Sequence, residues 1–107
     1  MKQIQIITTT DSQPYDVMSS KRREIGAKGG TLGLSSASEP GAEPREETWT
    51  HKKYGGGIRI TATDDDLVLA HVWGDSSDNE AIVLGAFLSW IFRNCGDIIL
   101  AVNIQFT

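Results

Sequence analysis

Residues 78–95 have the sequence DNEAIVLGAFLSWIFRNC, and this stretch predicts one helix that is apolar on almost every side. At about 100° per residue, its apolar side chains fill two opposite stripes, and its polar side chains are scattered between them. One stripe holds Ile82, Val83, Ala86, Phe87, Trp90 and Ile91, and the other holds Ala81, Leu84, Leu88 and Phe92. A sheet of the same chain covers only one side of a helix about 10 Å across. We therefore expect Leu84, Leu88 and Phe92 to contact a second copy in a homo-oligomer.

The ends of this helix are marked by polar residues and glycine. Ser77 with Glu80 three positions later predicts an N-terminal capping box, and Gly96 directly after Cys95 predicts the C-cap. The apolar run, 81–92, is about half the ~20 residues that a membrane-spanning helix needs. The sequence therefore favours a helix of a soluble domain.

Alternating apolar and polar residues predict strands on both sides of residues 26–47. These strands cover residues 2–10, 48–54, 57–63, 67–73 and 97–107. Gly55-Gly56-Gly57 and Asp64-Asp65-Asp66 predict the two turns of an antiparallel meander. The last strand is apolar on both faces in its first half, which is typical of a central strand.

The order of these elements predicts an α+β fold. We expect a two-layer sandwich, in which a five-stranded, mainly antiparallel sheet carries the one long apolar helix on one face. A short helix is also predicted over residues 15–25, although two serines weaken it. We interpret the 107 residues as one domain.

Residues 26–47 are rich in Gly, Ser, Pro and Glu. Such a segment buries too little apolar surface to offset the cost of ordering its backbone, about 1–2 kcal/mol per residue. We therefore predict a mobile internal loop at about 26–47, which is a ligand lid, a partner-binding segment or an inert linker.

Charge is distributed unevenly along a chain whose net charge is −4. Residues 1–60 hold nine basic and seven acidic side chains, whereas residues 61–107 hold one basic and seven acidic side chains. Nucleic acid is therefore not favoured as a partner, but an anion site in the first half is possible. The single cysteine, Cys95, excludes an internal disulfide, and residues 1–10 are too polar for an export signal. We expect a cytoplasmic location.

The glycine-rich residues 26–36 are the closest approach to a ligand motif, because glycines let backbone N–H groups turn toward an anion. They depart from a phosphate-binding loop, since Leu34 precedes Ser35 where such a loop has its lysine. This departure argues against a nucleotide hydrolase. A flexible linker is the alternative interpretation of the segment.

Basic and aromatic side chains predict a binding site for an anionic, nucleotide-like small molecule. The expected site comprises Arg22, Arg23, Lys28, the backbone of Gly29 and Gly30, Arg59, and Trp49 or Tyr54 as a stacking platform. We expect Trp73 to be a core or interface residue instead.

Catalysis has little support in the sequence. His51 and His71 lie on different strands without a paired spacing, and nothing nominates a nucleophile beside them. Cys95 lies at the negative end of a helix dipole, which raises the pKa of its thiol. We therefore predict a non-enzymatic, homo-oligomeric binding protein without metal or cofactor. Two alternatives are an inhibitor or adaptor whose 26–47 segment folds onto a partner protein, and, less favoured, a small hydrolase that uses a histidine.

Overall fold

A computed structural model describes residues 2–9, 13–26, 31–39, 41, 44–63 and 67–106. Its elements follow in the order β1 (Lys2–Thr8), α1 (Pro14–Gly26), β2 (Leu32–Ala37), β3 (Glu46–His51), β4 (Gly56–Ala62), β5 (Val68–Gly74), α2 (Ser77–Cys95) and β6 (Ile99–Phe106). The predicted α+β class is confirmed. The described residues form six strands, one more than predicted, and two helices. The short helix predicted over residues 15–25 is present as α1.

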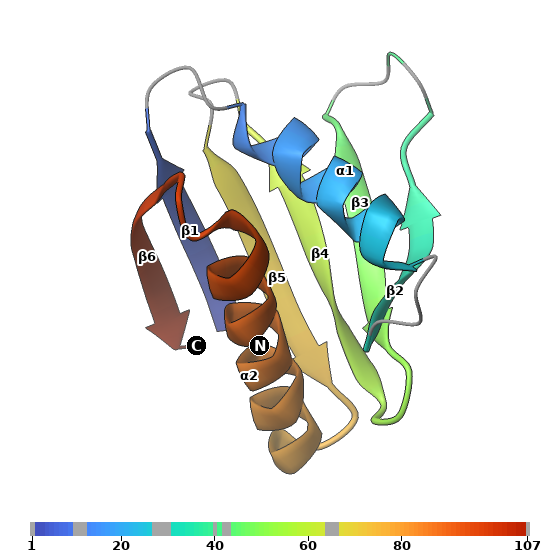
Figure 1. Cartoon of the computed structure of the whole chain (residues 1–107). Helices are drawn as coiled ribbons and strands as arrows, with labels where there is room; N and C mark the ends of the chain where they lie inside the picture. The colour runs from blue at the N-terminus through green and yellow to red at the C-terminus, as the bar shows by residue number, and fades with distance from the viewer. Residues whose placement is uncertain are drawn as a thin grey trace.

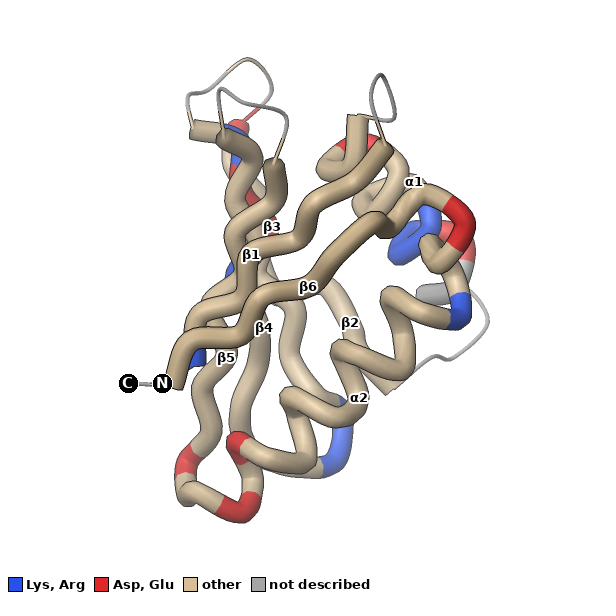
Figure 2. The backbone as a smooth tube through the Cα atoms, turned by 90° about the vertical axis from the view of Figure 1, so that its left-hand side faces the viewer, with Lys and Arg blue, Asp and Glu red and all other residues tan. Residues whose placement is uncertain are grey.

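The six strands form one open sheet in the order β2-β3-β4-β5-β1-β6, and each neighbouring pair is antiparallel. Both helices lie on the same face of this sheet, α1 across the β2 side and α2 along β5 and β4 (Figure 1). The molecule therefore has two layers, and the second face of the sheet carries no helix of the described chain (Figure 2).

β2 is the strand that the sequence analysis missed, because it lies inside the segment expected to be a loop. It pairs with β3 from Leu32 opposite His51 to Ala37 opposite Glu47, with a register shift between Leu34 and Ser36. Only Leu32 of its six side chains is buried. Backbone hydrogen bonds to β3, rather than buried side chains, hold this strand in the sheet. Its sequence therefore needs no apolar alternation, and without alternation no strand was predicted.

The core lies between the sheet and the two helices, and it is built by alternation in the strands. Ile4, Ile6, Trp49, Ile58, Ile60, Val68, Ala70 and Val72 point from the sheet toward the helices. α2 contributes Val83, Phe87, Ile91 and Cys95. Burying side chains of this size supplies about 1.5–3 kcal/mol each.

Two contacts fix the rotation of α2 about its axis. Trp90 on one flank packs edge-to-face against Trp49 of β3, with ring centroids 4.8 Å apart. On the other flank, the Lys2 ammonium of β1 lies 2.7 Å from the Glu80 carboxylate, and its hydrogen bond lowers the pKa of Glu80. Residues four positions apart share a face of a helix, so the stripe from Glu80 through Leu84 and Leu88 lies toward β1.

The ends of α2 differ slightly from the prediction. Ser76, not Ser77, is the N-cap, and its hydroxyl accepts a hydrogen bond from the Asn79 backbone N–H at 3.1 Å. Gly96 is the C-cap, as predicted, with an ordinary helical φ of −59°. No described helix has both the length and the hydropathy to cross a lipid bilayer.

β6 contradicts its predicted central position, because it pairs with β1 alone and forms one edge of the sheet. Its apolar composition suggested two neighbouring strands, and the described chain supplies only one.

Candidate functional site

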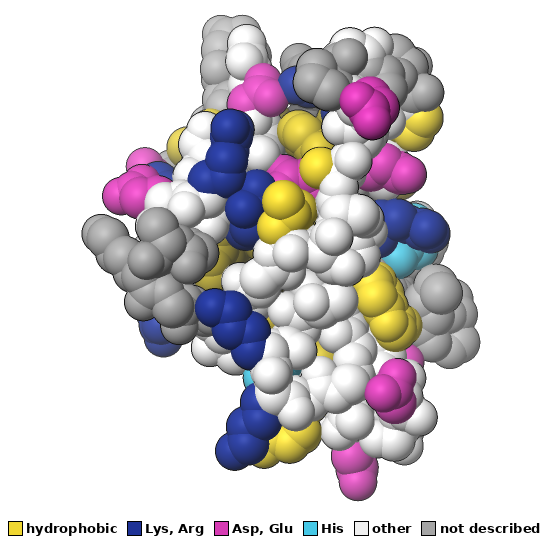
Figure 3. Space-filling model, turned by 90° about the vertical axis from the view of Figure 1, so that its right-hand side faces the viewer, with side chains coloured by type: hydrophobic (Ala, Val, Ile, Leu, Met, Phe, Trp, Pro, Cys, Tyr) yellow, Lys and Arg dark blue, Asp and Glu magenta, His cyan; other side chains and the backbone are white. Residues whose placement is uncertain are grey.

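An open groove of about 380 Å³ lies between α1 and the β2–β3 pair. It is lined by Tyr15, Ser19, Arg22, Arg23, Leu34, Ala37, Ser38, Glu39, Gly41, Arg45 and Glu47. Three of these side chains are arginines that come from two separate segments of the chain. On this side of the molecule, basic side chains lie close to acidic and hydrophobic ones (Figure 3).

Arg22 forms the buried base of the groove. Tyr15, Met18 and Arg22 follow the helical spacing and turn inward from α1, and all three are buried. The Arg22 Nε and Nη2 atoms donate hydrogen bonds to Glu47 Oε1 at 3.2 and 2.9 Å. Glu47 lies on the inward face of β3, two residues before Trp49, so this ion pair ties α1 to the sheet.

The second carboxylate oxygen of Glu47 differs from the first. Glu47 Oε2 is buried and has no hydrogen-bond partner among the described residues. A buried acceptor without a partner costs about 1–3 kcal/mol. The Glu47 carboxylate therefore has unused capacity for one hydrogen-bond donor.

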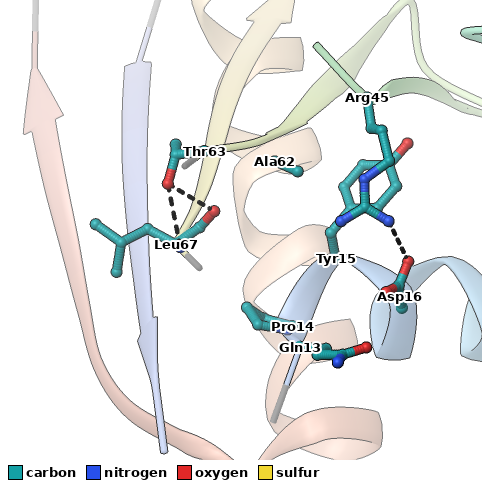
Figure 4. A pocket seen from close by; sticks show the side chains of 8 residues that line it. All are labelled: Gln13, Pro14, Tyr15, Asp16, Arg45, Ala62, Thr63 and Leu67. Atoms are coloured by element: carbon teal, nitrogen blue, oxygen red, sulfur yellow. Dashed lines mark hydrogen bonds and ion pairs between the residues drawn. The ribbon is translucent and has the colours of Figure 1, made fainter. Parts of the chain in front are cut away.

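Arg45 stands over the Tyr15 ring at the other end of the groove, with its guanidinium 5.0 Å from the ring centroid. Its Nη1 atom donates to Asp16 Oδ1 at 2.6 Å, in a pair that is about half exposed. Figure 4 shows this pair at one side of a second cavity, which Tyr15, Asp16 and Arg45 line and whose volume is about 400 Å³. Tyr15 and Arg45 thus separate two adjacent cavities.

Burial raises the pKa of Tyr15 to about 12, and the nearby Glu47 carboxylate adds to this rise. The Tyr15 hydroxyl is protonated at neutral pH like that of any tyrosine, and its raised pKa keeps it a hydrogen-bond donor in mildly alkaline solution as well.

Arg23 is the most available cation of the groove. It is exposed on α1, and its Nε atom donates only a long 3.5 Å hydrogen bond to the Ser19 carbonyl. No carboxylate pairs with it among the described residues. Three arginines against two glutamates leave the lining net positive in a chain of net charge −4.

The structure brings together only some of the predicted site residues. Arg22 and Arg23 line the groove, and Lys28, Gly29 and Gly30 lie outside the described residues. Arg59 is exposed on the helix-free face, where it lies opposite Thr48 and His71. Tyr54 lies in the turn between β3 and β4, near His51 and Lys53.

Trp49 is a correction to the predicted site. Its side chain is fully buried and packs against Phe87 and Trp90 of α2, so it presents no face to a ligand. Trp73, which we expected to be a core or interface residue, is half-buried on the helix-free face, outside the core, where its ring lies over Gly57. The sequence could not distinguish these two tryptophans, because both lie on alternating strands.

The predicted interface residues of α2 are not equally exposed. Leu84 and Leu88 pack partly against the core, whereas Phe92 is 62% exposed.

Tyr15, Arg45 and Glu47 are the site residues that sequence reasoning missed. Arg45 and Glu47 lie at the end of residues 26–47, and the predicted strand began only at residue 48, so neither residue was placed on the sheet. The one available signal was the i, i+7 spacing of Tyr15 and Arg22, which places an arginine on the inward face of an amphipathic helix.

The two histidines and the cysteine do not combine into a catalytic group. His51 Nδ1 accepts hydrogen bonds from the backbone N–H groups of Lys53 and Tyr54, both at 3.1 Å, and so stabilises a turn. Burial raises the pKa of Cys95 to about 11, in the direction that the sequence predicted. Among the described residues, no three His, Cys, Asp or Glu side chains are close enough to hold a metal ion. Asp64, Asp65 and Asp66 lie outside those residues.

Comparisons of the chain with protein families, with curated proteins and with solved structures found no match in any of the three.

Proposed function

We propose that the protein is a small, non-catalytic homo-oligomer that captures an anionic, nucleotide-like small molecule. The proposed site is the groove between α1 and the β2–β3 pair. Relative to the sequence prediction, Arg45 with the hydroxyls of Ser19 and Ser38 replaces Arg59, Tyr54 and Trp49.

The observation that carries this proposal is that Arg22, Arg23 and Arg45 line one groove. A guanidinium presents a fork of N–H donors that matches phosphate and carboxylate oxygens. Arg23 has no carboxylate partner among the described residues, and Arg45 has only the half-exposed Asp16. An anion can therefore bind Arg23 and attract Arg45 without opening the buried Arg22–Glu47 pair.

Groove size and chemistry favour a nucleotide-like ligand over a simple anion. The groove and the adjacent cavity, about 380 and 400 Å³, each fall within the range of about 300–1,000 Å³ that is typical of small-molecule sites. Leu34 and Ala37 give the groove an apolar wall, against which a base could lie. The Ser19 and Ser38 side chains, which also line the groove, supply hydroxyls for polar groups of the ligand.

Thermal unfolding with inorganic phosphate, pyrophosphate, AMP, ATP or GTP tests the proposal. A ligand at 100 times its Kd stabilises the folded state by about 2.7 kcal/mol. In a domain of this size, that corresponds to a rise in Tm of roughly 10 °C or more. We expect at least one nucleotide to give such a rise, and phosphate alone to give less.

Two charge reversals locate the site. Arg23→Glu should weaken nucleotide binding tenfold or more, because it replaces a charge-assisted donor by a like charge. Arg59→Glu is the matched control and should bind normally, since Arg59 lies on the other face of the sheet. Unchanged Tm with every nucleotide would refute the proposal, and loss of binding only in Arg59→Glu would move the site to the sheet face.

A protein partner is the second candidate, and the exposed side of β2 favours it. Leu34, Ser35, Ser36 and Ala37 are all exposed at this edge of the sheet. In this alternative, residues 26–47 bind a partner protein. Leu34→Lys should then disrupt the binding of that partner, and nucleotides should leave the Tm of the protein unchanged.

A further inference from the structure

β6 is an edge strand with the composition of a central one. Its eight residues, ILAVNIQF, include no charge, no proline and no glycine. The tube of β6 has the colour of neither basic nor acidic residues along its length (Figure 2). An edge strand presents unpaired backbone N–H and C=O groups, and natural proteins protect such edges with charges, proline, bulges or a covering element.

The opposite edge of the sheet is shorter and more polar. β2 has six residues, two of them serine, and its register shifts between Leu34 and Ser36. β6 is longer and more apolar, and the register shift between β1 and β6 lies near its start. The two edges therefore differ, and β6 is the one suited to accept another strand.

Apolar side chains accompany this open backbone edge. Leu100 is 67% exposed and Phe106 is 71% exposed on β6. Phe92 of α2 belongs to the helix stripe of Glu80, Leu84 and Leu88, which lies toward β1, the only described strand paired with β6.

We propose that a second copy of the chain binds at β6, through antiparallel β6–β6 pairing across a two-fold axis. The two sheets would then form one continuous sheet, and β6 would gain the second neighbour that its composition predicts. The positions of the exposed apolar side chains favour one register. With Asn103 opposite Asn103 of the second copy, Leu100 lies opposite Phe106 of that copy, so the two most exposed apolar side chains of β6 cover each other.

A second copy suits this edge better than an unrelated strand, because the edge is complementary to itself. In a two-fold pair the same surface of each copy forms the interface. A strand that carried charges of one sign would therefore bring like charges together. β6 has no charge to repel its copy. Leu100, Phe106 and Phe92 together expose roughly 400 Å² per copy, taking about 200 Å² for a fully exposed aromatic side chain.

The exposed apolar side chains alone fall short of a standard interface, so other parts of the β6 edge must contribute. Roughly 800 Å² from both copies compares with 1,200–2,000 Å² of total buried surface in a standard interface. The backbone edge of β6 and the partly buried Leu84, Leu88, Val102 and Ile104 add to that figure. The inference rests only on the assembly part of the proposed function. The arginine groove lies at the β2 edge, so the two can fail independently.

Two double variants test the pairing by light scattering during gel filtration. Leu100→Lys with Phe106→Lys places like charges opposite each other in the proposed register and should weaken the dimer at least tenfold. Leu100→Lys with Phe106→Glu places opposite charges there and should restore much of the dimer. Circular dichroism checks that both variants fold. Ile82→Lys is the control and should remain dimeric, because Ile82 lies on α2 and is less exposed than Leu100 or Phe106.

A cysteine scan tests the register. Antiparallel partners have Cα atoms about 4.5–5.5 Å apart, within the range of 4.4–6.8 Å that a disulfide bridges. Asn103→Cys should therefore form a covalent dimer on mild oxidation. Gln105→Cys should not, because the two copies of residue 105 would lie about 13 Å apart. The native Cys95 is buried and should not interfere.

Three results would overturn the inference. They are a monomeric wild-type protein, a dimer that the two lysines leave intact, and equal cross-linking through residues 103 and 105. An assembly larger than a dimer, whose mass the two lysines halve, supports it, because β6 then forms one of two interfaces. If the Arg23→Glu protein still forms the oligomer, its affinity for nucleotides tests only the proposed groove and not the β6 pairing.

Discussion

Arg22 of α1 donates a buried hydrogen bond of 2.9 Å to Glu47 of β3, and the two residues are 25 positions apart in the chain. The pair holds the helix against the sheet and forms the base of the groove. Both side chains are nearly inaccessible to water, with 10% and 4% of their surface exposed.

Removing one partner of this pair should strongly destabilise the fold. Glu47→Ala leaves the Arg22 guanidinium buried without a counter-charge, and we expect unfolding in urea to show a loss of about 3–5 kcal/mol. Replacing both residues, Arg22→Met with Glu47→Leu, should recover most of the loss. Asp16→Ala breaks the exposed pair with Arg45 and should cost less than about 1 kcal/mol. Equal losses for the Glu47 and Asp16 variants would contradict the burial of the first pair.

Two glycine-to-alanine substitutions should have effects of opposite sign. Gly85 is exposed in the middle of α2 with nothing near a Cβ atom, so Gly85→Ala should stabilise the protein by about 0.5–1 kcal/mol. A Cβ at Gly57 would collide with the Trp49 carbonyl and the Trp73 ring. Gly57→Ala should therefore lower the Tm in the same calorimetric series. A neutral Gly57→Ala would show that β3 and β4 can separate without cost.

Cys95 should be almost unreactive in the folded protein. Burial raises its pKa to about 11 from an ordinary value of 9. This shift lowers the thiolate fraction at pH 8 about 100-fold, and burial also blocks access. Labelling with a chromogenic disulfide should be slow in native buffer and fast in guanidinium chloride. Rapid native labelling would show that the C-terminal end of α2 opens readily.

Tyr15 should make the fold less stable in alkali. Its pKa is about 12 in the folded protein against an ordinary 10, so below pH 10 the phenol is protonated in both states and contributes no pH dependence. Between pH 10 and 12 the unfolded chain ionises first, and stability falls as pH rises. Tyr15→Phe should flatten this part of the Tm–pH curve. An absorbance titration in which every tyrosine ionises below pH 11 would contradict the prediction.

Local pattern was sufficient for most of the elements. Strict alternation in β4 and β5, with turn residues between the strands, predicted both strands and their antiparallel pairing. The apolar run of α2 predicted the long helix, with its N-cap misplaced by one residue. β2 was not predicted, because Gly33 and the serines of this segment show no alternation of apolar and polar residues. Only pairing with the adjacent β3 makes the segment a strand.

The site was less predictable than the fold, because it depends on contacts between distant residues. Arg22 and Arg23 were recognisable as a basic cluster on a short helix. Nothing near Arg22 in the sequence indicated that Glu47 would neutralise it, and nothing near Trp49 indicated that Phe87 and Trp90 would cover it. Arg45 became a candidate only when β3 placed it beside Tyr15.

The sequence by itself determined the helices and most of the strands, because their hydrophobic periods are local properties of consecutive residues. Only the tertiary structure decided the order of the strands and the side of α2 that faces the sheet. It also placed β6 at an edge, although its composition suits a central strand. These outcomes depend on how elements far apart in the chain pack together, and no pattern within one element specifies its neighbours.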